Sequence, residues 1–503
     1  MALLLAHPPV GLWWTTFLHA PLLLAAVWAA GDEARPRAVS GLGALAGAVA
    51  FGPLIGWIAA PAGWVGWGLL VALQSAWMAV LAWLLWHVRS HRYVPALGAV
   101  LFTGIDAWRG IVPFNGFEWG AIPYAHVDSW MLPVARVLGA RGITLLVVLA
   151  SLAALVVVRD LWAIRGAVAR QGLPHRPIAM LVAALLASAL LVSDPPPPTG
   201  SIDILVAQGH DVRFWEDPVA DLAHTVATNL RDDTLAAIGD GPSPDLVVWP
   251  ESSVDRDPSS GGGAMLAPLV DEVASVAGEL IAGTTLDGPS PGQDRYVAAS
   301  RYVGGFHEVE RYVKRRLVPF GEYVPLRPLI GWFPPLEQVP RDAIAGDAPM
   351  IMHTTHGARV AVVICFETLF AGIVRGNVLA EDEPAQLVLT LTNDASFRDT
   401  GEPAQHLAQS RLRAVETGRW VVHAALSGAS AFVDPDGRVH DETQVFTRDT
   451  IRRDVPLVEG RTPYLVIGDV VGWTTRIGVL LLAGLVAWGG RAGRSSGGSL
   501  SRR

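Results

Sequence analysis

The sequence predicts a polytopic α-helical membrane domain joined to an α/β extramembrane domain. Of its 503 residues, 51% are hydrophobic and only 17% are charged, whereas soluble proteins average about 25% charged residues. Apolar runs recur through the first 193 residues and return near the C-terminus. Between them, short β-rich runs alternate with helical stretches, a pattern that is typical of α/β folds.

The distribution of charge divides the chain in the same places. Residues 1–193 carry 11 Arg against 6 Asp and Glu, and residues 464–503 carry 5 Arg against 1 Asp. Residues 194–463 carry 22 Arg and Lys against 39 Asp and Glu, a net charge of −17. An acidic middle therefore lies between two apolar, mildly basic ends. Its negative charge argues against nucleic acid as a partner.

We expect helices at seven apolar runs, most of which approach the ~20 residues needed to cross a bilayer. These runs are at about 12–30, 39–60, 63–87, 94–112, 141–158, 178–193 and 466–489. Their repetition excludes a signal peptide, which would be a single short run with a cleavage site. Residues 2–6 are apolar but too few to span, so we interpret them as the stub of a further helix.

Arginine positions set the expected orientation of these helices. The loops 31–38, 88–93 and 159–177 and the tail 491–503 all carry arginines, and all four can lie in the cytoplasm if the helices alternate. The acidic block then lies outside the cytoplasm. This topology predicts a multi-pass protein of the cytoplasmic (inner) membrane. The loop 113–140 departs from the pattern because it also carries an arginine, so we interpret it as a re-entrant or interfacial segment.

The predicted domain organisation follows from these features. Residues 1–193 hold six transmembrane helices and the stub, and residues 200–463 form the α/β domain, which is long enough for one large core. Between them lies a Pro-rich linker at 194–199, whose four consecutive prolines form a stiff spacer. A C-terminal transmembrane helix at 464–490 and a basic cytoplasmic tail at 491–503 complete the chain.

Strands and helices of the α/β domain are read from short apolar runs and helical periodicity. Strands are expected at 202–207, 246–249, 280–283, 296–302, 360–364, 387–392, 420–425 and 431–433. Helices are expected at about 217–238, 264–277 and 402–417. The segment Asp434–Gly437, of sequence DPDG, is typical of a hairpin turn.

Three chemically distinctive residues lie close to these strands. Glu251 follows the strand at 246–249, and Cys365, the only cysteine, follows the strand at 360–364. Lys314 is the only lysine beside 37 arginines. A Cys nucleophile needs a base to form the thiolate, and a developing oxyanion needs a fixed positive charge. Glu, Lys and Cys supply these three parts, and a single Cys excludes an intrachain disulfide or a Cys-rich metal site.

Each of the three residues also has an ordinary interpretation. A lone Cys after a strand is most often a buried small hydrophobe, and Glu251 alone can be a helix-start carboxylate. Lys314 is followed by Arg315 and Arg316, so it can belong to a solvated basic patch. The three together, each in a distinctive local sequence, favour a catalytic site.

The motifs around these residues resemble the nitrilase superfamily. They are WPES at 249–252, YVKRRLVPFGEYVP at 312–325 and ICFE at 364–367. The form LVPFGEYVP, with membrane helices on both sides, resembles the apolipoprotein N-acyltransferase family in particular. The resemblance implies a Glu–Lys–Cys triad on an α-β-β-α sandwich. It also implies eight helices, so an upstream start codon or a truncated first helix would explain the stub.

The resemblance implies a role for each triad residue. Cys365 would accept the acyl group, Glu251 would be the general base, and Lys314 would stabilise the oxyanion. The same resemblance assigns two supporting carboxylates, Glu322 and Glu367, and three substrate-binding residues, Trp215, Phe366 and Asn393. It implies no metal and no organic cofactor, because the acyl donor is already an activated ester.

This sequence departs from the family pattern around the pocket. Ser396 stands where a Trp is usual, Phe366 stands where Tyr is common, and the stretch 423–430 replaces a more usual pattern. The apolar segment 326–336 is expected either to contact lipid, through Leu329, Ile330, Trp332 and Phe333, or to pack in the core.

The function that the resemblance implies is acyl transfer in lipoprotein maturation. A phospholipid would donate a fatty acyl chain to Cys365, and the thioester would acylate the N-terminal α-amine of a diacylglyceryl-cysteine lipoprotein. The expected partners are therefore a phospholipid acyl donor, a diacylated lipoprotein acceptor and the lipid bilayer. One alternative is a membrane-tethered amidase or nitrilase-type C–N hydrolase with water as acceptor. Another is a non-enzymatic lipoprotein-binding protein with a degenerate site.

Overall fold

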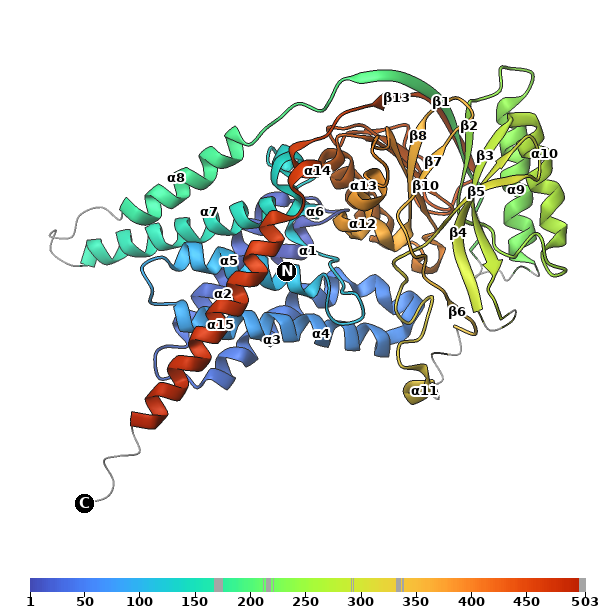
Figure 1. Ribbon diagram of the computed structural model, residues 1–503. Helices are drawn as coiled ribbons and strands as arrows, with labels where there is room; N and C mark the ends of the chain where they lie inside the picture. Colours follow the sequence, from blue (N-terminus) through green and yellow to red (C-terminus); the bar gives the residue numbers. More distant parts are fainter. Residues whose placement is uncertain are drawn as a thin grey trace. The chain divides into compact units, whose positions relative to one another are not determined.

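The chain forms two compact units in the computed structural model (Figure 1), which describes residues 1–166, 175–210, 212–213, 219, 221–290, 292, 294–331, 336 and 339–496. The first unit, which we call the helical unit, consists of residues 1–56, 64–192 and the C-terminal segment from residue 469. The second, which we call the α/β unit, consists of residues 57–63 and 193–468.

Helices lie at all seven predicted apolar runs. The longer helices are α2 (Thr16–Ala29), α3 (Pro36–Leu54), α4 (Ala59–Val88), α5 (Val94–Arg109), α7 (Ala135–Gly166), α8 (His175–Leu190) and α15 (Val470–Ser496), and the short ones are α1 (Ala2–Ala6) and α6 (Ile122–Ala125). Among the described residues, four helical segments are long and apolar enough to cross a membrane, at 36–54, 56–88, 132–162 and 470–488, and two apolar helices are shorter. The membrane-domain bounds, and the orientation of the helices, stay predictions.

Small residues allow close helix packing in the helical unit. Gly43 and Gly47 lie four residues apart on α3. A methyl group at Gly43 would lie 2.4 Å from the Met78 carbonyl oxygen of α4, and one at Gly47 would lie 2.7 Å from the Ser75 Cα. This spacing of glycines is typical of helix pairs in membranes, where close backbone approach replaces the hydrophobic driving force.

Buried charges in the helical unit are paired with one another. The Asp106 carboxylate contacts Arg109 Nε at 2.6 Å and Arg141 Nη1 at 2.9 Å, and Arg141 Nη2 contacts Glu118 Oε1 at 2.9 Å. Two cations and two anions therefore cancel, as buried charges require. Arg109 and Arg141, which flank the predicted loop 113–140, belong to this network, and Arg136 inside the loop is also buried.

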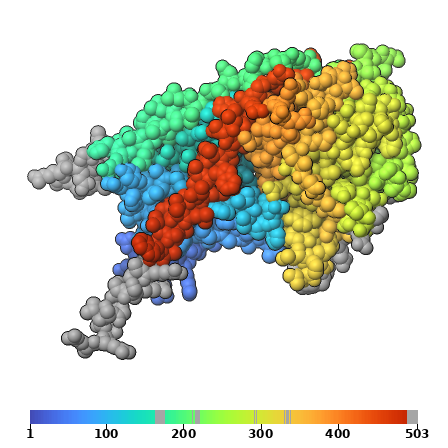
Figure 2. Space-filling model, viewed as in Figure 1, coloured from blue at the N-terminus to red at the C-terminus, as the bar shows by residue number. Residues whose placement is uncertain are grey.

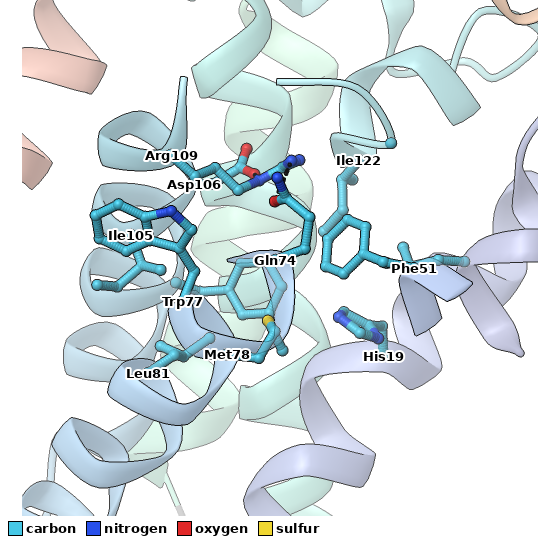
Figure 3. Close-up of a pocket in the computed structure, with 13 residues that line it drawn as sticks. His19, Phe51, Gln74, Trp77, Met78, Leu81, Ile105, Asp106, Arg109 and Ile122 are labelled. Atoms are coloured by element: carbon cyan, nitrogen blue, oxygen red, sulfur yellow. Dashed lines mark hydrogen bonds and ion pairs between the residues drawn. The ribbon is translucent and has the colours of Figure 1, made fainter. Parts of the chain in front are cut away.

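A small cavity adjoins this network (Figure 3). Arg109 Nη1 donates to Gln74 Oε1 at 3.2 Å on its polar side, and Phe51, Trp77 and Ile105 are among its apolar walls. Its volume is about 20 Å³, which is room for roughly one water molecule. It is far too small for a lipid chain.

The described residues of the α/β unit form two β-sheets. The first has the strand order β13-β1-β2-β3-β4-β5, with β6 paired to β4; its strands are β1 (Pro198–Gln208), β2 (Leu246–Val254), β3 (Glu279–Asp287), β4 (Asp294–Val303), β5 (Glu308–Val313), β6 (Asp342–Ala343) and β13 (Asp449–Val458). The second has the order β12-β11-β10-β9-β8-β7; its strands are β7 (Ile351–His353), β8 (Arg359–Ile364), β9 (Leu387–Thr392), β10 (Trp420–Ala425), β11 (Ala431–Val433) and β12 (Val439–His440). Strands β1 to β3 are parallel, and so are β8 to β10.

The two sheets pack face to face, and helices cover their outer faces (Figure 1). Side chains alternate along β1: Ile204 and Val206 enter the core between the sheets, whereas Leu205 packs under α9 (Leu222–Ile238) and α10 (Ala267–Ala277). Helices α12 (Ala371–Val378) and α13 (Glu402–Thr417) cover the second sheet in the same way. Strands buried on both faces explain the continuous apolar runs. The predicted α-β-β-α sandwich is confirmed.

Cap residues set the ends of these helices. The Asp221 side chain accepts a hydrogen bond from the His224 N–H and begins α9, as an N-cap does. Gly418, with φ of 65°, ends α13 in the left-handed conformation that favours glycine. The predicted helix start, at about 217, lies outside the described residues, and α9 as described begins at Leu222.

The strand β2 is interrupted where it carries Glu251. Its pairing with β3 shifts register between Trp249 and Val254, and Ser252 has φ of 59°. Gly283 of β3 makes this irregularity possible, since a methyl group there would lie 2.3 Å from the Pro250 carbonyl oxygen and 2.5 Å from the Glu251 Cα. The missing side chain of Gly283 therefore leaves the space that the Glu251 backbone occupies.

Replacing Gly283 should displace Glu251. We expect Gly283→Ala to lower stability by about 1–3 kcal/mol, the usual cost of overpacking a rigid core, and to reduce activity further by moving Glu251. Gly200→Ala is a matched control, because Gly200 also lies in a strand and a methyl group there meets nothing within 4 Å. Thermal unfolding of both variants in detergent measures the effect, and equal melting temperatures would contradict the prediction.

Candidate active site

The ends of strands from both sheets meet at one site. Glu251 lies in β2 of the first sheet, and Cys365 and Asn393 directly follow β8 and β9 of the second. Carboxyl ends of parallel strands are where ligands bind in many α/β folds. Lys314 follows β5 and is held by the backbone, its N–H donating to the Val297 carbonyl at 2.9 Å. The structure thus brings the three predicted triad residues together.

Lys314 is the centre of this site. Its side chain is 0% exposed, and its Nζ lies 3.0 Å from Glu251 Oε1 and 2.5 Å from Glu322 Oε1. Burial acts to lower the pKa of Lys314, but the charges of Glu251 and Glu322 outweigh it and hold the pKa well above its usual value. Lys314 is therefore a fixed buried cation, and the interpretation as part of a solvated patch is wrong.

Glu322 is positioned by the turn that its motif forms. Phe320 has φ of 64°, and its N–H donates to the Tyr323 carbonyl at 2.7 Å. The Glu322 side chain accepts the Val318 N–H at 2.8 Å through Oε2 and leaves Oε1 for Lys314. One carboxylate therefore links the turn to the buried ammonium.

Glu251 faces both Lys314 and the second sheet. Its Oε2 accepts the Asn393 N–H at 3.1 Å. Burial raises the pKa of Glu251 above its usual value, outweighing the opposing charge of Lys314 and the hydrogen bonds from Lys314 and the Cys365 thiol. A carboxylate with a raised pKa beside a thiol is suited to accept its proton.

Cys365 has an unusual backbone conformation. It is the first residue of the 3-10 turn Cys365–Leu369 and has φ of 48°, in the left-handed region. Non-glycine residues adopt this region rarely, and at a cost. Burial and the negative charge of Glu251 raise the pKa of Cys365 well above its usual value, against the opposing charge of Lys314. The resting residue is therefore a thiol that needs a base. Cys365 is half-buried and packs against the core between the sheets, and its position beside Glu251 and Lys314 favours the catalytic interpretation.

Glu367 joins the Cys365 turn to the Lys314 loop. Its Oε1 accepts the N–H groups of Arg315 at 2.7 Å and Arg316 at 3.0 Å, and its Oε2 accepts the N–H of Ile364 at 2.9 Å. The Tyr312 hydroxyl also donates to it at 2.9 Å. This fully buried carboxylate fixes the distance between the two loops without contacting the thiol.

The remaining predicted site residues are the three assigned to substrate binding. Trp215 lies outside the described residues. Phe366 is buried against the ring of Phe370, with ring centres 4.9 Å apart. Asn393 is half-buried, and its Oδ1 accepts the Ala395 N–H at 3.1 Å. Ser396, which departs from the family pattern, is exposed.

Residues beneath Cys365 were missed by the sequence reasoning. His406 of α13 lies with its Nε2 3.2 Å from the Cys365 carbonyl oxygen, and its Nδ1 faces Asp394 and Glu402. The available signal was the polar series Glu402, His406, Gln409 and Arg413, which recurs at helical spacing. All four side chains are buried, whereas such a series would ordinarily be read as a solvated face.

Comparisons with known proteins agree with this architecture. The sequence model described as apolipoprotein N-acyltransferase N-terminal domain matches residues 1–153, and the one described as carbon-nitrogen hydrolase matches residues 244–462. Among solved structures, the chain is similar to an amidase from Nesterenkonia sp. AN1, with 20% identity, 55% of this chain and 96% of that chain covered, and a TM-score of 0.39.

Three curated relatives cover between 73% and 100% of this chain. The apolipoprotein N-acyltransferase of Gloeobacter violaceus is 33% identical, with 100% of this chain and 94% of the relative covered. The protein of that name from Rhizobium rhizogenes is 30% identical, with 86% and 84% covered. That from Haemophilus ducreyi is 29% identical, with 73% and 71% covered. The match includes both the helical N-terminal part and the strands that carry Glu251, Lys314 and Cys365, and the chain therefore belongs to the apolipoprotein N-acyltransferase family.

Proposed function

We propose that this protein transfers a fatty acyl chain from a membrane phospholipid to the N-terminal α-amine of diacylglyceryl-cysteine lipoproteins, through a thioester on Cys365. The observation that carries the proposal is the Cys365 thiol beside the Glu251 carboxylate, which is itself paired with the buried Lys314 ammonium. Relatives that cover nearly the whole chain are named apolipoprotein N-acyltransferase.

The first half-reaction forms the thioester. Glu251 takes the thiol proton as Cys365 Sγ attacks the ester carbonyl of the phospholipid. The negative charge that develops on the carbonyl oxygen is stabilised by the Lys314 ammonium. The lysophospholipid then leaves as an alcohol with the proton that Glu251 held. The chemistry is nucleophilic and electrostatic, because the acyl donor is an activated ester.

The second half-reaction transfers the acyl group. The lipoprotein α-amine attacks the thioester carbonyl, Lys314 again stabilises the oxyanion, and Glu251 takes the amine proton. An amide bond forms, and the Cys365 thiolate leaves and regains its proton from Glu251. Glu322 and Glu367 support these steps by holding the Lys314 ammonium and the Lys314 loop in place.

Lipid substrates imply a lipid-facing surface on the α/β unit. The segment around α11 (Arg327–Ile330) exposes Leu326 by 60% and Leu329 by 69%, and Figure 2 shows this yellow segment as a protrusion at the lower edge. Of the predicted lipid-contacting residues, Trp332 and Phe333 lie outside the described part of the chain. We propose that this segment contacts the bilayer, on the extracytoplasmic side of the cytoplasmic membrane.

A hydrolase is the second candidate function. The carbon-nitrogen hydrolase match over residues 244–462 favours it, because the same triad would release a small amide's ammonia if water replaced the amine as acceptor. The acyl donor and the acceptor distinguish the two functions.

The thioester is the intermediate to detect first. Purified protein incubated with phospholipid should gain the mass of one acyl chain, and hydroxylamine should remove it. Cys365→Ala should gain nothing while keeping the wild-type melting temperature within a few degrees. Supply of a diacylated lipopeptide should discharge the adduct into a triacylated product. Ammonia release from small amides, without an acyl adduct, would instead support the hydrolase.

The general base should be visible in the pH dependence. Glu251 must be deprotonated to act, and burial raises its pKa. Thioester formation should therefore fall as the pH drops through this raised value, at higher pH than for an ordinary Glu with a pKa of about 4.3.

Substitution of the base provides the matching control. Glu251→Gln should lower the rate of thioester formation by about 10²- to 10⁴-fold and flatten this acid limb, as followed by intact mass at several pH values. A Glu251→Gln enzyme with the wild-type profile would contradict the assignment.

The exposed leucines should affect lipid substrates selectively. Leu329→Ser should reduce turnover of phospholipid in mixed micelles by about 3- to 10-fold, since part of the 1.5–3 kcal/mol that a buried Leu contributes would be lost. Its melting temperature should not change, as is usual for surface sites. Val309→Ser, at an exposed position on β5, is the control. An equal loss with a short, water-soluble ester donor would refute lipid contact by this segment.

A further inference from the structure

A buried polar cluster lies directly behind the nucleophile. Asp394, Glu402 and His406 are each 0–1% exposed, and their nearest ligand atoms lie within 4.8 Å of one another. His406 comes from α13, whereas Asp394 follows β9. The cluster uses none of the triad side chains, yet one of its members contacts the Cys365 backbone.

The contact of His406 with Cys365 fixes one ring nitrogen. His406 Nε2 lies 3.2 Å from the Cys365 carbonyl oxygen. A carbonyl oxygen only accepts hydrogen bonds, so Nε2 carries a hydrogen and donates it. The hydrogen bond holds the carbonyl of the residue whose backbone adopts the left-handed conformation, with φ of 48°.

The second ring nitrogen also faces acceptors. His406 Nδ1 lies 3.2 Å from Asp394 Oδ1 and 3.2 Å from Thr392 Oγ1. The Thr392 hydroxyl has one hydrogen, which it donates to Asp394 Oδ1 at 2.9 Å. His406 therefore lies between two acceptors, with Nε2 directed at the Cys365 carbonyl and Nδ1 directed at the Asp394 carboxylate. Asp394 thereby orients the ring.

Burial and hydrogen bonding set the electrostatics of the cluster. Burial acts to raise the pKa of Asp394, but the hydrogen bond and charge of His406 outweigh it and lower this pKa. Burial and the charge of Asp394 raise the pKa of Glu402 well above its usual value. His423, whose ring lies 5.3 Å from that of His406, has its pKa lowered by burial to about 3 and is neutral.

We propose that His406 is a positioning residue for the acyl transfer: its hydrogen bond to the Cys365 carbonyl holds the nucleophile's backbone in the left-handed conformation, and Asp394 fixes the ring. This inference rests on the proposed function and adds a residue to it. The conformation places the Cys365 thiol against Glu251. A displacement of about 1 Å at such a site costs on the order of 10²-fold in rate, so the hydrogen bond contributes through geometry.

Two substitutions separate the two ring nitrogens. In His406→Gln, the side-chain amide nitrogen takes the place of Nε2 and can still donate to the Cys365 carbonyl. In His406→Asn, the amide nitrogen takes the place of Nδ1 and can reach Asp394 but not Cys365. Each variant keeps one of the two polar contacts, so a merely structural role predicts similar behaviour for both.

The rate of thioester formation from phospholipid is the main measurement, in a single turnover of full-length protein in detergent. We expect His406→Asn to lower this rate by about 100-fold and His406→Gln by less than about 5-fold, at similar melting temperatures. Equal rates in the two variants, or rates that follow melting temperature, would overturn the proposal. If His406→Asn does not fold, Asp394→Asn is used instead. We expect this variant to lower the rate while the KM for the donor stays unchanged, and a wild-type rate would contradict the proposal.

Alkylation of Cys365 tests the positioning without any acyl donor. Iodoacetamide should label Cys365 more slowly in His406→Asn than in His406→Gln, because the thiol loses its alignment with Glu251. If the wild-type protein forms no thioester, the proposed function fails, but this comparison still decides the role of His406. Equal labelling of the two variants would overturn the proposed role of His406. The proposal would also be overturned if purified wild-type protein held a stoichiometric metal ion and Glu402→Gln removed that ion.

Discussion

The buried Lys314 ammonium is the interaction on which the rest of the site depends. A cation removed from water is costly unless charges of opposite sign surround it, and Glu251 and Glu322 lie 3.0 and 2.5 Å from its Nζ. Glu251 comes from the irregular strand β2, and Glu322 comes from the tight turn at Phe320. Pairing with the Lys314 ammonium therefore stabilises both irregular backbone segments. Gly283 and the left-handed Phe320 are consequences of this constraint, since both let the backbone approach closely enough to pair.

Strain at the nucleophile is opposed by a hydrogen bond from helix α13. A non-glycine residue in the left-handed region costs about 1–3 kcal/mol, and a typical hydrogen bond contributes about 0.5–1.5 kcal/mol. One bond from His406 therefore offsets part of the cost of the Cys365 conformation. Glu367 acts from the other side by binding the Lys314 loop to the same turn. The thiol is thus fixed through its backbone, which leaves the side chain free to react.

The sequence predicts the α/β layering and the three candidate site residues because both depend on local patterns, whereas the sandwich is implied by the family resemblance. Strands buried on both faces are continuous apolar runs, and Glu251, Lys314 and Cys365 each lie in a distinctive motif. Edge strands are harder to predict from the sequence, because they are not continuous apolar runs. Strands β5 and β13 carry charged residues along exposed faces, and β13 contains Pro456. The link between His406 and Cys365 joins residues 41 positions apart. Such contacts depend on tertiary packing, which periodicity does not report.

Transfer and hydrolysis need the same three side chains, so the physical distinction lies in how the substrates arrive. Extracting a lipid chain from a bilayer costs about 0.8 kcal/mol per CH₂ group, which over a long chain exceeds what a triad gains by binding one ester.

An enzyme for lipid donors therefore benefits from apolar surface beside its site and from helices that hold it at the membrane. Leu326 and Leu329 supply such surface a few residues after Glu322. The four long apolar helices supply the attachment. A hydrolase of small soluble amides would gain from neither, which is why the whole chain, and not the triad alone, favours acyl transfer.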